Sequence, residues 1–251
     1  MSRSVGIVVP AFRPDVDRLA GYVHDLRAEL APATLRIEVD EPSDPTATAL
    51  ADLPATVNVS PYRRGKGAAI TAGFEALDTD ILAFADADGS TPASELARVV
   101  DAVGESDLAV GSRRHPDATI TSHQTFARRF LGDGFAWLAR RLLDADLYDY
   151  QCGAKALTRD AWDTVRAHLY EPGFAWDVEL VAMAGALELD VEEVPITWED
   201  MPNSTVSPVR TSLRLARALF VARHRAKQIR NNRVHNAIAA TREDPTALVE
   251  K

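Results

Sequence analysis

The chain has 251 residues, 46% of them hydrophobic, a net charge of −9 and one cysteine, Cys152. This composition excludes a largely disordered chain and a fold held by internal disulfides, and the acidity excludes nucleic acid as a partner of most of the surface. The N-terminus shows no signal-peptide pattern, and no apolar run approaches the roughly 18 residues of a membrane-spanning helix, so we expect a cytoplasmic globular protein.

Strand-like and helix-like segments alternate through the first half of the chain. Pro14 suits the first turn of the first helix, and a Ser or Thr at 90–91 is expected to cap the fourth. The alternation predicts an α/β fold with a mostly parallel sheet, helices on both faces, and ligands beyond the carboxyl ends of the strands. We expect strands at 4–10, 35–40, 55–60, 80–86 and 107–112 and helices at 14–30, 45–52, 66–77 and 92–103.

The second expected strand ends at Asp40, in the stretch VDEPSD at 39–44. Its carboxylate is placed there to accept hydrogen bonds from a nucleotide base or ribose. An aspartate that caps a helix is the alternative interpretation, and it is the commoner one.

Lys66 lies between two glycines, just before an expected helix. Backbone N–H groups and an ammonium at a helix N-terminus favour a diphosphate. The spacing is not that of a Walker A loop. An ordinary loop with a solvated lysine explains this motif equally well when it is taken alone.

Asp86 and Asp88 follow an apolar run at the end of the fourth expected strand. Carboxylates two residues apart can both turn toward a Mg²⁺ or Mn²⁺ ion that bridges two phosphates, and Gly89 lets the backbone turn sharply beside them. The alternative is that Asp86 only ends the strand and that Asp88 belongs to an ordinary turn.

The second half of the chain is richer in helices. No linker or repeat separates the halves, so we expect a single domain at 1–235, with internal divisions after 121 and 207. We expect helices at 122–144, 159–168, 174–186 and 208–230, a strand at 190–200 and a polar tail at 236–251.

Three arginines have the chemistry of phosphate binding, because Arg113, Arg128 and Arg129 offer forked donors. The stretch YDYQCGAKAL brings Asp149, Gln151 and Lys155 together around a glycine. The alternative for the arginines is a solvated surface position.

Asp177 and Glu179 stand among apolar residues at the start of an expected helix. Acids at this position can simply complement the helix dipole.

The segment from Pro208 to Arg233 contains eight Arg or Lys residues and no Asp or Glu. Interleaved apolar residues predict a basic amphipathic helix that can lie on an anionic membrane. An apolar stripe that packs on the domain is a nearly equal alternative. The apolar residues are Leu213, Leu215, Leu219, Phe220 and Val221.

Taken together and in this order, the motifs resemble the family 2 inverting glycosyltransferases of GT-A fold, closest to the dolichyl-phosphate glucosyltransferases and the related mannose synthases. Two stretches depart from that family: PAFRPD stands for P-A-Y-N-E, and DEPS stands for D-D-G-S, both at the nucleotide-base end. The resemblance is carried, over about residues 5 to 223, by VVPAF, VDEPSD, RRGKGAAITAG, DADGST, GSR, RRFLGDGF, YDYQCGAKALTRDA, FAWDVEL, VPITWED and NSTVSPVRTSLRLARALFVAR.

The resemblance implies a Rossmann-like half at 1–121 that binds a nucleotide sugar, an acceptor half at 122–207 and a peripheral membrane helix at 208–235. It implies transfer of glucose or mannose from a nucleoside-diphosphate sugar to dolichyl or polyprenyl phosphate, with inversion, at the inner face of the cell membrane, in support of protein glycosylation or glycan assembly.

The resemblance also implies site residues. Donor contacts are expected from Pro10, Phe12, Asp40, Lys66, Gly67, Asp86 and Ala87, and Mg²⁺ or Mn²⁺ ligands from Asp86, Asp88 and Ser90. Acceptor-phosphate contacts are expected from Arg113, Arg128, Arg129 and Lys155, with Asp88, Arg113 and Asp177 as catalytic residues.

Two other functions stay open on the sequence alone. A family 2 enzyme of the same fold can act on a saccharide or small-molecule hydroxyl, with Asp177 as the best base. A non-catalytic protein that binds membrane or nucleic acid through the basic helix is the second, and the complete DADGST and GKG stretches argue against it.

Overall fold

The computed structural model describes residues 3–121, 126–198, 208–240 and 245–251, and it leaves the side chains of 126–131 and 208–213 undescribed. One sheet has the strand order β3-β2-β1-β4-β7-β5-β8. Neighbouring strands are parallel except at β7, which is antiparallel to both β4 and β5. The strands are β1 (Val5–Phe12), β2 (Thr34–Asp40), β3 (Thr56–Ser60), β4 (Ile81–Ala85), β5 (Leu108–Ser112), β7 (Ala154–Thr158) and β8 (Val191–Pro195).

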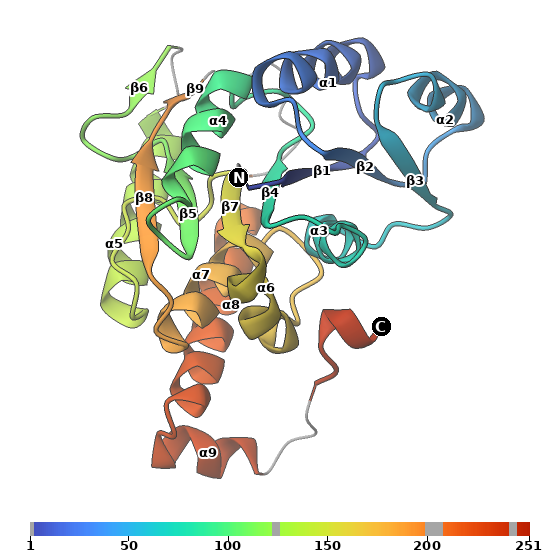
Figure 1. Cartoon of the computed structure of the whole chain (residues 1–251). Helices are drawn as coiled ribbons and strands as arrows, with labels where there is room; N and C mark the ends of the chain where they lie inside the picture. The colour runs from blue at the N-terminus through green and yellow to red at the C-terminus, as the bar shows by residue number, and fades with distance from the viewer. Residues whose placement is uncertain (1–2, 122–125, 199–207, 241–244) are drawn as a thin grey trace.

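Helices cover both faces of this sheet, as Figure 1 shows. Alternate residues of β1 enter two hydrophobic cores, because successive side chains of a strand point to opposite faces: Ile7 and Val9 enter one core and Val8 the other. The first core includes side chains of α1 (Val16–Leu30), α2 (Asp44–Ala51) and α4 (Ala93–Ala102). The second includes α3 (Lys66–Glu75), α5 (Phe126–Leu142), α6 (Arg159–Val165), α7 (Trp176–Ala186) and α8 (Pro208–Ile229). The expected α/β fold is confirmed.

β7 was not expected as a strand. Lys155 stands in its middle and pairs with Phe84 of β4, so the segment does not read as an apolar central strand. A buried lysine is tolerated there because its charge is paired, as described below. The expected strand at 190–200 divides into β8 and β9 (Thr197–Trp198), and β9 pairs with β6 (Thr119–Ile120) in a small second sheet.

Two expected helix starts differ in the structure. Asp15 is the N-cap of α1 and accepts a hydrogen bond from the backbone N–H of Arg18, so Pro14 precedes the cap instead of lying in the first turn. Pro92 is the N-cap residue of α4, and no side chain caps that helix, so neither Ser90 nor Thr91 has the expected capping role.

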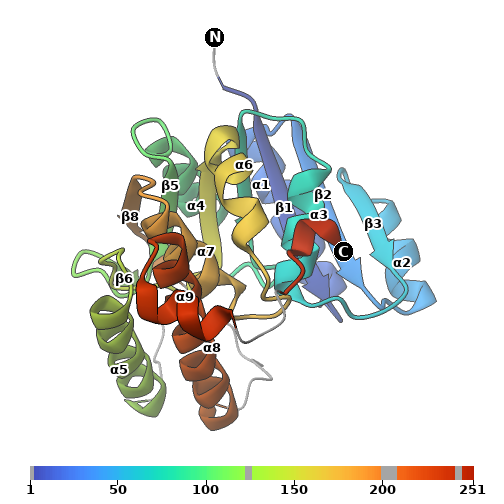
Figure 2. The same cartoon turned by 90° about the horizontal axis from the view of Figure 1, so that it is seen from below.

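The chain beyond residue 235 is more ordered than the expected polar tail. α9 (Arg233–Ala239) follows α8, and a short 3-10 turn spans Leu248–Glu250. The N–H of Leu248 donates to the carbonyl oxygen of Leu169 at 2.8 Å, and the Leu248 side chain joins the core. Figure 2 shows this C-terminal turn beside α3.

Candidate functional site

A buried aspartate holds the loop that carries Lys66. Asp40 ends β2, and its Oδ2 accepts hydrogen bonds from the backbone N–H groups of Arg64 (2.8 Å) and Gly65 (2.9 Å). Its Oδ1 accepts a third from Nε of Arg64 at 2.8 Å. Residues 61–67, called the Lys66 loop below, are thereby fixed at the carboxyl edge of the sheet. Asp40 binds its own chain in this way, and its expected contact with a base or ribose stays a prediction.

Glu38 adds a second anchor for the same loop. Its side chain is fully buried, and its carboxylate accepts hydrogen bonds from Nε of Arg36 at 2.5 Å and Nδ2 of Asn58 at 2.7 Å. Nη2 of Arg64 lies 3.0 Å from Oε2 of the same carboxylate. Arg64 is therefore paired with two buried acids, which fixes the direction in which the loop leaves the sheet.

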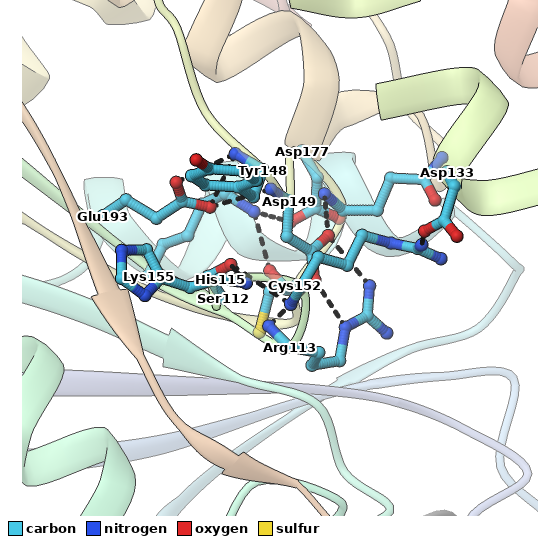
Figure 3. Close-up of polar contacts among 12 residues, drawn as sticks. Ser112, Arg113, His115, Asp133, Tyr148, Asp149, Cys152, Lys155, Asp177 and Glu193 are labelled. Carbon is cyan, nitrogen blue, oxygen red and sulfur yellow. Dashed lines mark hydrogen bonds and ion pairs between the residues drawn. The ribbon is translucent and has the colours of Figure 1, made fainter. Parts of the chain in front are cut away.

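Lys66 begins a connected set of charges. Its Nζ lies 2.9 Å from Oδ1 of Asp86, directly after β4, and 2.8 Å from Oδ2 of Asp177 in α7. Oδ1 of Asp177 accepts a hydrogen bond at 2.8 Å from Nζ of Lys155, and both residues appear in Figure 3. These four residues, together with Asp88, are called the lysine–carboxylate cluster below. The cluster therefore joins the Lys66 loop, the end of β4, β7 and α7.

The lysine–carboxylate cluster favours an added cation. Burial lowers the pKa of Lys66, but Asp177 and Asp86 raise it above its ordinary value, so the ammonium stays charged. Partial burial raises the pKa of the half-exposed Asp86 carboxyl, and Lys66 opposes that shift. Because the cluster contains two lysines and three aspartates, it has one negative charge in excess when all are ionised.

The turn after Asp86 is tied to α1. Gly89 has φ +67°, the left-handed conformation expected of a glycine at a sharp turn. Oδ1 of the exposed Asp88 accepts a hydrogen bond from the N–H of Ser90 at 3.0 Å. The hydroxyl of Tyr22 in α1 donates to the carbonyl oxygen of Thr91 at 2.8 Å. The Ser90 backbone therefore orients Asp88, and metal ligation by the Ser90 hydroxyl stays a prediction.

Asp86 and Asp88 suit a hard divalent cation. The Asp86 side chain is 40% exposed, and it lies so close to Gly153 that a Cβ there would come within 1.9 Å of Oδ2. Over the described part of the chain, no three His, Cys, Asp or Glu side chains form a metal site by themselves. Mg²⁺ is commonly held by one or two carboxylates with substrate phosphates and water. The two aspartates fit an ion whose coordination the phosphates complete.

Arg113 and Asp149 form a second charged unit, shown in Figure 3. Nε and Nη2 of Arg113 donate to the two Asp149 oxygens at 2.6 and 3.0 Å. Burial raises the pKa of Asp149, but the Arg113 guanidinium outweighs it and lowers that pKa to about 2. Glu193 of β8 accepts hydrogen bonds from the N–H groups of Tyr148 and Asp149 and so fixes the loop that carries Asp149. The Asp149 carboxylate is therefore satisfied without a ligand.

Lys155 and Asp177 are buried and paired with each other. The Lys155 side chain is fully buried, and its Nζ donates to the carbonyl oxygen of Cys152 at 2.7 Å as well as to Asp177. Lys155 is thus buried and paired within the chain, and its expected contact with an acceptor phosphate stays a prediction. The Asp177 side chain is 2% exposed and lies between the ammonium groups of Lys66 and Lys155, so it holds the two lysines together, and its expected catalytic role stays a prediction.

The expected donor contacts lie along the same edge. Pro10 is buried in β1, and half-buried Phe12 carries the guanidinium of Arg63 over its ring at 4.1 Å. Gly67 is buried against the carbonyl oxygen of Glu171, which a Cβ would approach to 2.4 Å. Ala87, the remaining expected donor contact, is half-buried. Of the expected acceptor contacts, Arg128 and Arg129 belong to α5, and their side chains lie outside the described residues.

Three residues that organise the site were missed from the sequence: Glu38, Tyr22 and Glu193. The first lies inside a strand, the second inside a helix and the third in β8, and each acts through a partner distant in the chain. No local pattern marks such residues. Arg64 was visible in the sequence as part of the motif RRGKG. Its pairing with Glu38 and Asp40 in β2 could be identified only from the three-dimensional structure.

Comparison with known proteins identifies the family. Residues 7–163 match the family model for glycosyl transferase family 2. Glycosyltransferase AglD of Haloferax volcanii is 34% identical over 153 residues, which are 60% of this chain and 24% of that protein. Dolichyl-phosphate beta-glucosyltransferase of Mus musculus is 32% identical over 171 residues, 64% of this chain and 52% of that protein. The chain thus spans about a quarter to a half of the length of these relatives.

Solved structures support the same fold. Glucosyl-3-phosphoglycerate synthase from Mycobacterium tuberculosis, in complex with UDP, superposes with a TM-score of 0.66 at 16% identity and covers 88% of this chain and 80% of its own. Mannosyl-3-phosphoglycerate synthase from Rubrobacter xylanophilus gives 0.65 at 16% identity, with 96% and 77% covered. These likenesses bear on the fold alone. The matched family model covers more than half of the chain, and the chain therefore belongs to glycosyl transferase family 2, with the GT-A-like fold that its motifs implied.

Proposed function

We propose that this chain transfers a hexose, glucose or mannose, from a nucleoside-diphosphate sugar to a dolichyl or polyprenyl phosphate with inversion at the anomeric carbon. The observation that carries the proposal is the lysine–carboxylate cluster at the carboxyl edge of the sheet. There Lys66 opens α3 and reaches Asp86, while Asp88 stays exposed beside it. A helix N-terminus, an ammonium and two carboxylates are the groups that a metal-bound diphosphate requires.

The leaving diphosphate binds between the Lys66 loop and the DADGST turn. Lys66 stays protonated and donates to a diphosphate oxygen, while Asp86 and Asp88 would hold a divalent cation, Mg²⁺ or Mn²⁺. That ion, when bound, neutralises charge that grows on the leaving group. A glucosyl-3-phosphoglycerate synthase of similar fold was crystallised with Mn²⁺ and UDP.

The sugar acceptor attacks from the other side. An oxygen of the lipid phosphate forms the new bond to the anomeric carbon as the bond from that carbon to the diphosphate oxygen breaks. A phosphate is already ionised near neutral pH, so cationic positioning matters more than a general base. Arg113 uses one edge of its planar guanidinium for Asp149 and keeps the other for a phosphate, with Arg128 and Arg129 as further proposed contacts.

α8 provides a candidate membrane-facing surface. Leu219 of this helix is buried, whereas Phe220 and Val221 are 55% and 39% exposed, so the helix both packs on the domain and presents apolar groups beside arginines. An anionic membrane attracts such a surface. None of the described helices is long and apolar enough to span a bilayer. We place the protein peripherally at the inner face of the cell membrane.

The decisive experiment offers donors and acceptors in parallel. UDP-glucose and GDP-mannose are supplied with Mn²⁺ to the protein together with a short-chain polyprenyl phosphate, a free saccharide or 3-phosphoglycerate. We expect a polyprenyl-phosphate sugar as the main product. A product on the saccharide or on phosphoglycerate, without lipid product, would replace the proposed acceptor and favour the alternative in which a hydroxyl is glycosylated.

A further inference from the structure

The segment 169–173 lies directly against the Lys66 loop. The carbonyl oxygen of Pro172 accepts a hydrogen bond from the N–H of Ala68 at 3.1 Å. Gly65 has φ +101°, and a Cβ on it would come within 2.4 Å of the same oxygen. A Cβ on Gly67 would likewise come within 2.4 Å of the carbonyl oxygen of Glu171. The position of the loop is therefore set by this segment on one side as it is by Asp40 on the other.

Glu179 fixes segment 169–173 through hydrogen bonds to its backbone. It lies in the first turn of α7, its side chain is 3% exposed, and its Oε2 accepts hydrogen bonds from the N–H groups of Tyr170 (2.8 Å) and Glu171 (2.7 Å). A buried carboxylate that accepts two backbone hydrogen bonds is held firmly only if its charge is also balanced. The positive charge that balances Glu179 comes from α8.

Arg225 of α8 supplies it. Nη1 of Arg225 forms an ion pair and hydrogen bond with Oε1 of Glu179. The same guanidinium stacks on the ring of Tyr170, with its central carbon 4.3 Å from the ring centroid. One side chain of α8 thus contacts both the acid and the segment that the acid orients. Figure 2 shows α7 and α8 on the same side of the sheet as α3.

We propose that Arg225 and Glu179 are positioning residues that couple α8 to the donor-binding Lys66 loop. The contacts run from α8 through Glu179 to segment 169–173 and from there to the backbone of the loop. A shift of α8 that breaks the Arg225–Glu179 pair, such as one caused by a surface that the helix contacts, changes the affinity for the nucleoside diphosphate. This inference rests on the proposed function of the Lys66 loop, and it adds a route by which a distant helix controls it.

The test measures loop protection and nucleotide affinity in the same variants. Amide hydrogen exchange of Ala68 and of segment 169–173 reports the coupling without any ligand, and calorimetry with UDP or GDP plus Mn²⁺ reports donor affinity. We expect Arg225→Ala to speed the exchange and to weaken nucleotide binding by about five- to tenfold, with kcat at saturating donor little changed. Arg225→Lys should restore part of both, and Glu179→Gln should resemble Arg225→Ala.

Arg230→Ala is the matched control. Arg230 directly follows α8, pairs with Asp144 at 3.2 Å and donates to the carbonyl oxygen of Gly185 at 2.9 Å, so its loss removes contacts at the end of the helix and leaves the Arg225–Glu179 pair in place. We expect wild-type exchange at Ala68 and wild-type nucleotide affinity. The inference is overturned if Arg225→Ala leaves both unchanged, or if Arg230→Ala has the same effect. Failure of the wild type to bind either nucleotide would refute the proposed function instead, and the exchange at Ala68 would still decide the coupling.

Discussion

The two charged units of the site differ in how far they are satisfied by their own residues. Arg113 and Asp149 pair through two hydrogen bonds, and Glu193 fixes the loop behind them. The lysine–carboxylate cluster has more acids than bases, and its outermost member, Asp88, is exposed. The carboxylate of the first unit is fully paired by residues of the chain itself, whereas the second unit ends in a carboxylate that still has lone pairs for a ligand.

The difference separates residues that bind from residues that position. Asp177 is the buried centre of the cluster and should matter first for stability. Asp88 is its exposed end and should matter for the reaction while contributing little to stability. The following predictions test that division, from the largest expected effect to the smallest.

Asp177→Ala should destabilise the protein by about 3–5 kcal/mol, because it leaves two buried ammonium groups without their shared carboxylate. Urea unfolding gives the free energy of unfolding. Asp25→Ala, at an exposed position of α1, is the control and should stay within about 0.5 kcal/mol of wild type. An equally small change for Asp177→Ala would show that the lysines do not depend on it.

Asp88→Ala should lower the transfer rate by about 10²–10³-fold, the usual cost of removing a group that stabilises developing charge. Its melting temperature should stay near that of wild type, because the side chain is exposed. Initial rates with saturating Mn²⁺ measure the effect. The control is Asp101→Ala, which removes an exposed acid of α4 and should leave the transfer rate unchanged. Unaltered transfer by Asp88→Ala would remove this residue from the reaction.

The Arg113–Asp149 pair should persist in acid. A depressed carboxyl pKa contributes stability that is complete above the ordinary value of 3.8 and is lost as the pH falls through about 2. The contribution is about 2 kcal/mol. Carboxyl ¹³C shifts should give Asp149 a midpoint near 2 and a higher midpoint in Arg113→Ala. Arg141→Ala, which removes an exposed arginine of α5, should leave the midpoint in place. A wild-type midpoint near 3.8 would contradict the closed pair.

Tyr22→Phe should cost about 1 kcal/mol, since it removes the hydrogen bond to the carbonyl oxygen of Thr91 and nothing else. Transfer should fall only slightly, because the turn keeps Gly89 and the Asp88 to Ser90 contact. Chemical unfolding and initial rates measure the two effects. Tyr62→Phe, at a 65% exposed position, should change neither. A large loss of transfer would mean that Tyr22 itself contacts the reacting groups.

The sequence predicted the fold well where hydrophobic periodicity is strong. The five strands of the first half and the helices between them were placed correctly to within a few residues. β7 was missed because Lys155 breaks its apolar pattern, and Lys155 is acceptable there only because α7 brings Asp177 to it. The ordered turn at Leu248 was missed for a similar reason, since its partner Leu169 is far away in the chain.

The site was predictable in its types of residue and less so in its pairings. Motif spacing located Lys66, Asp86, Asp88 and Arg113 at one edge of a sheet. It could not show that Asp40 binds the Lys66 loop, because that pairing depends on how the chain returns from β3 to β2.

The central claim is that Asp86 and Asp88, with Lys66, bind the donor diphosphate through a divalent cation. Calorimetric titration of UDP-glucose and GDP-mannose, each with and without Mn²⁺, tests it most directly in wild type, Asp88→Ala and Asp101→Ala. We expect wild type and Asp101→Ala to bind one donor only when Mn²⁺ is present and Asp88→Ala to bind it at least about tenfold more weakly. Equal, Mn²⁺-independent affinity in all three proteins would contradict the account.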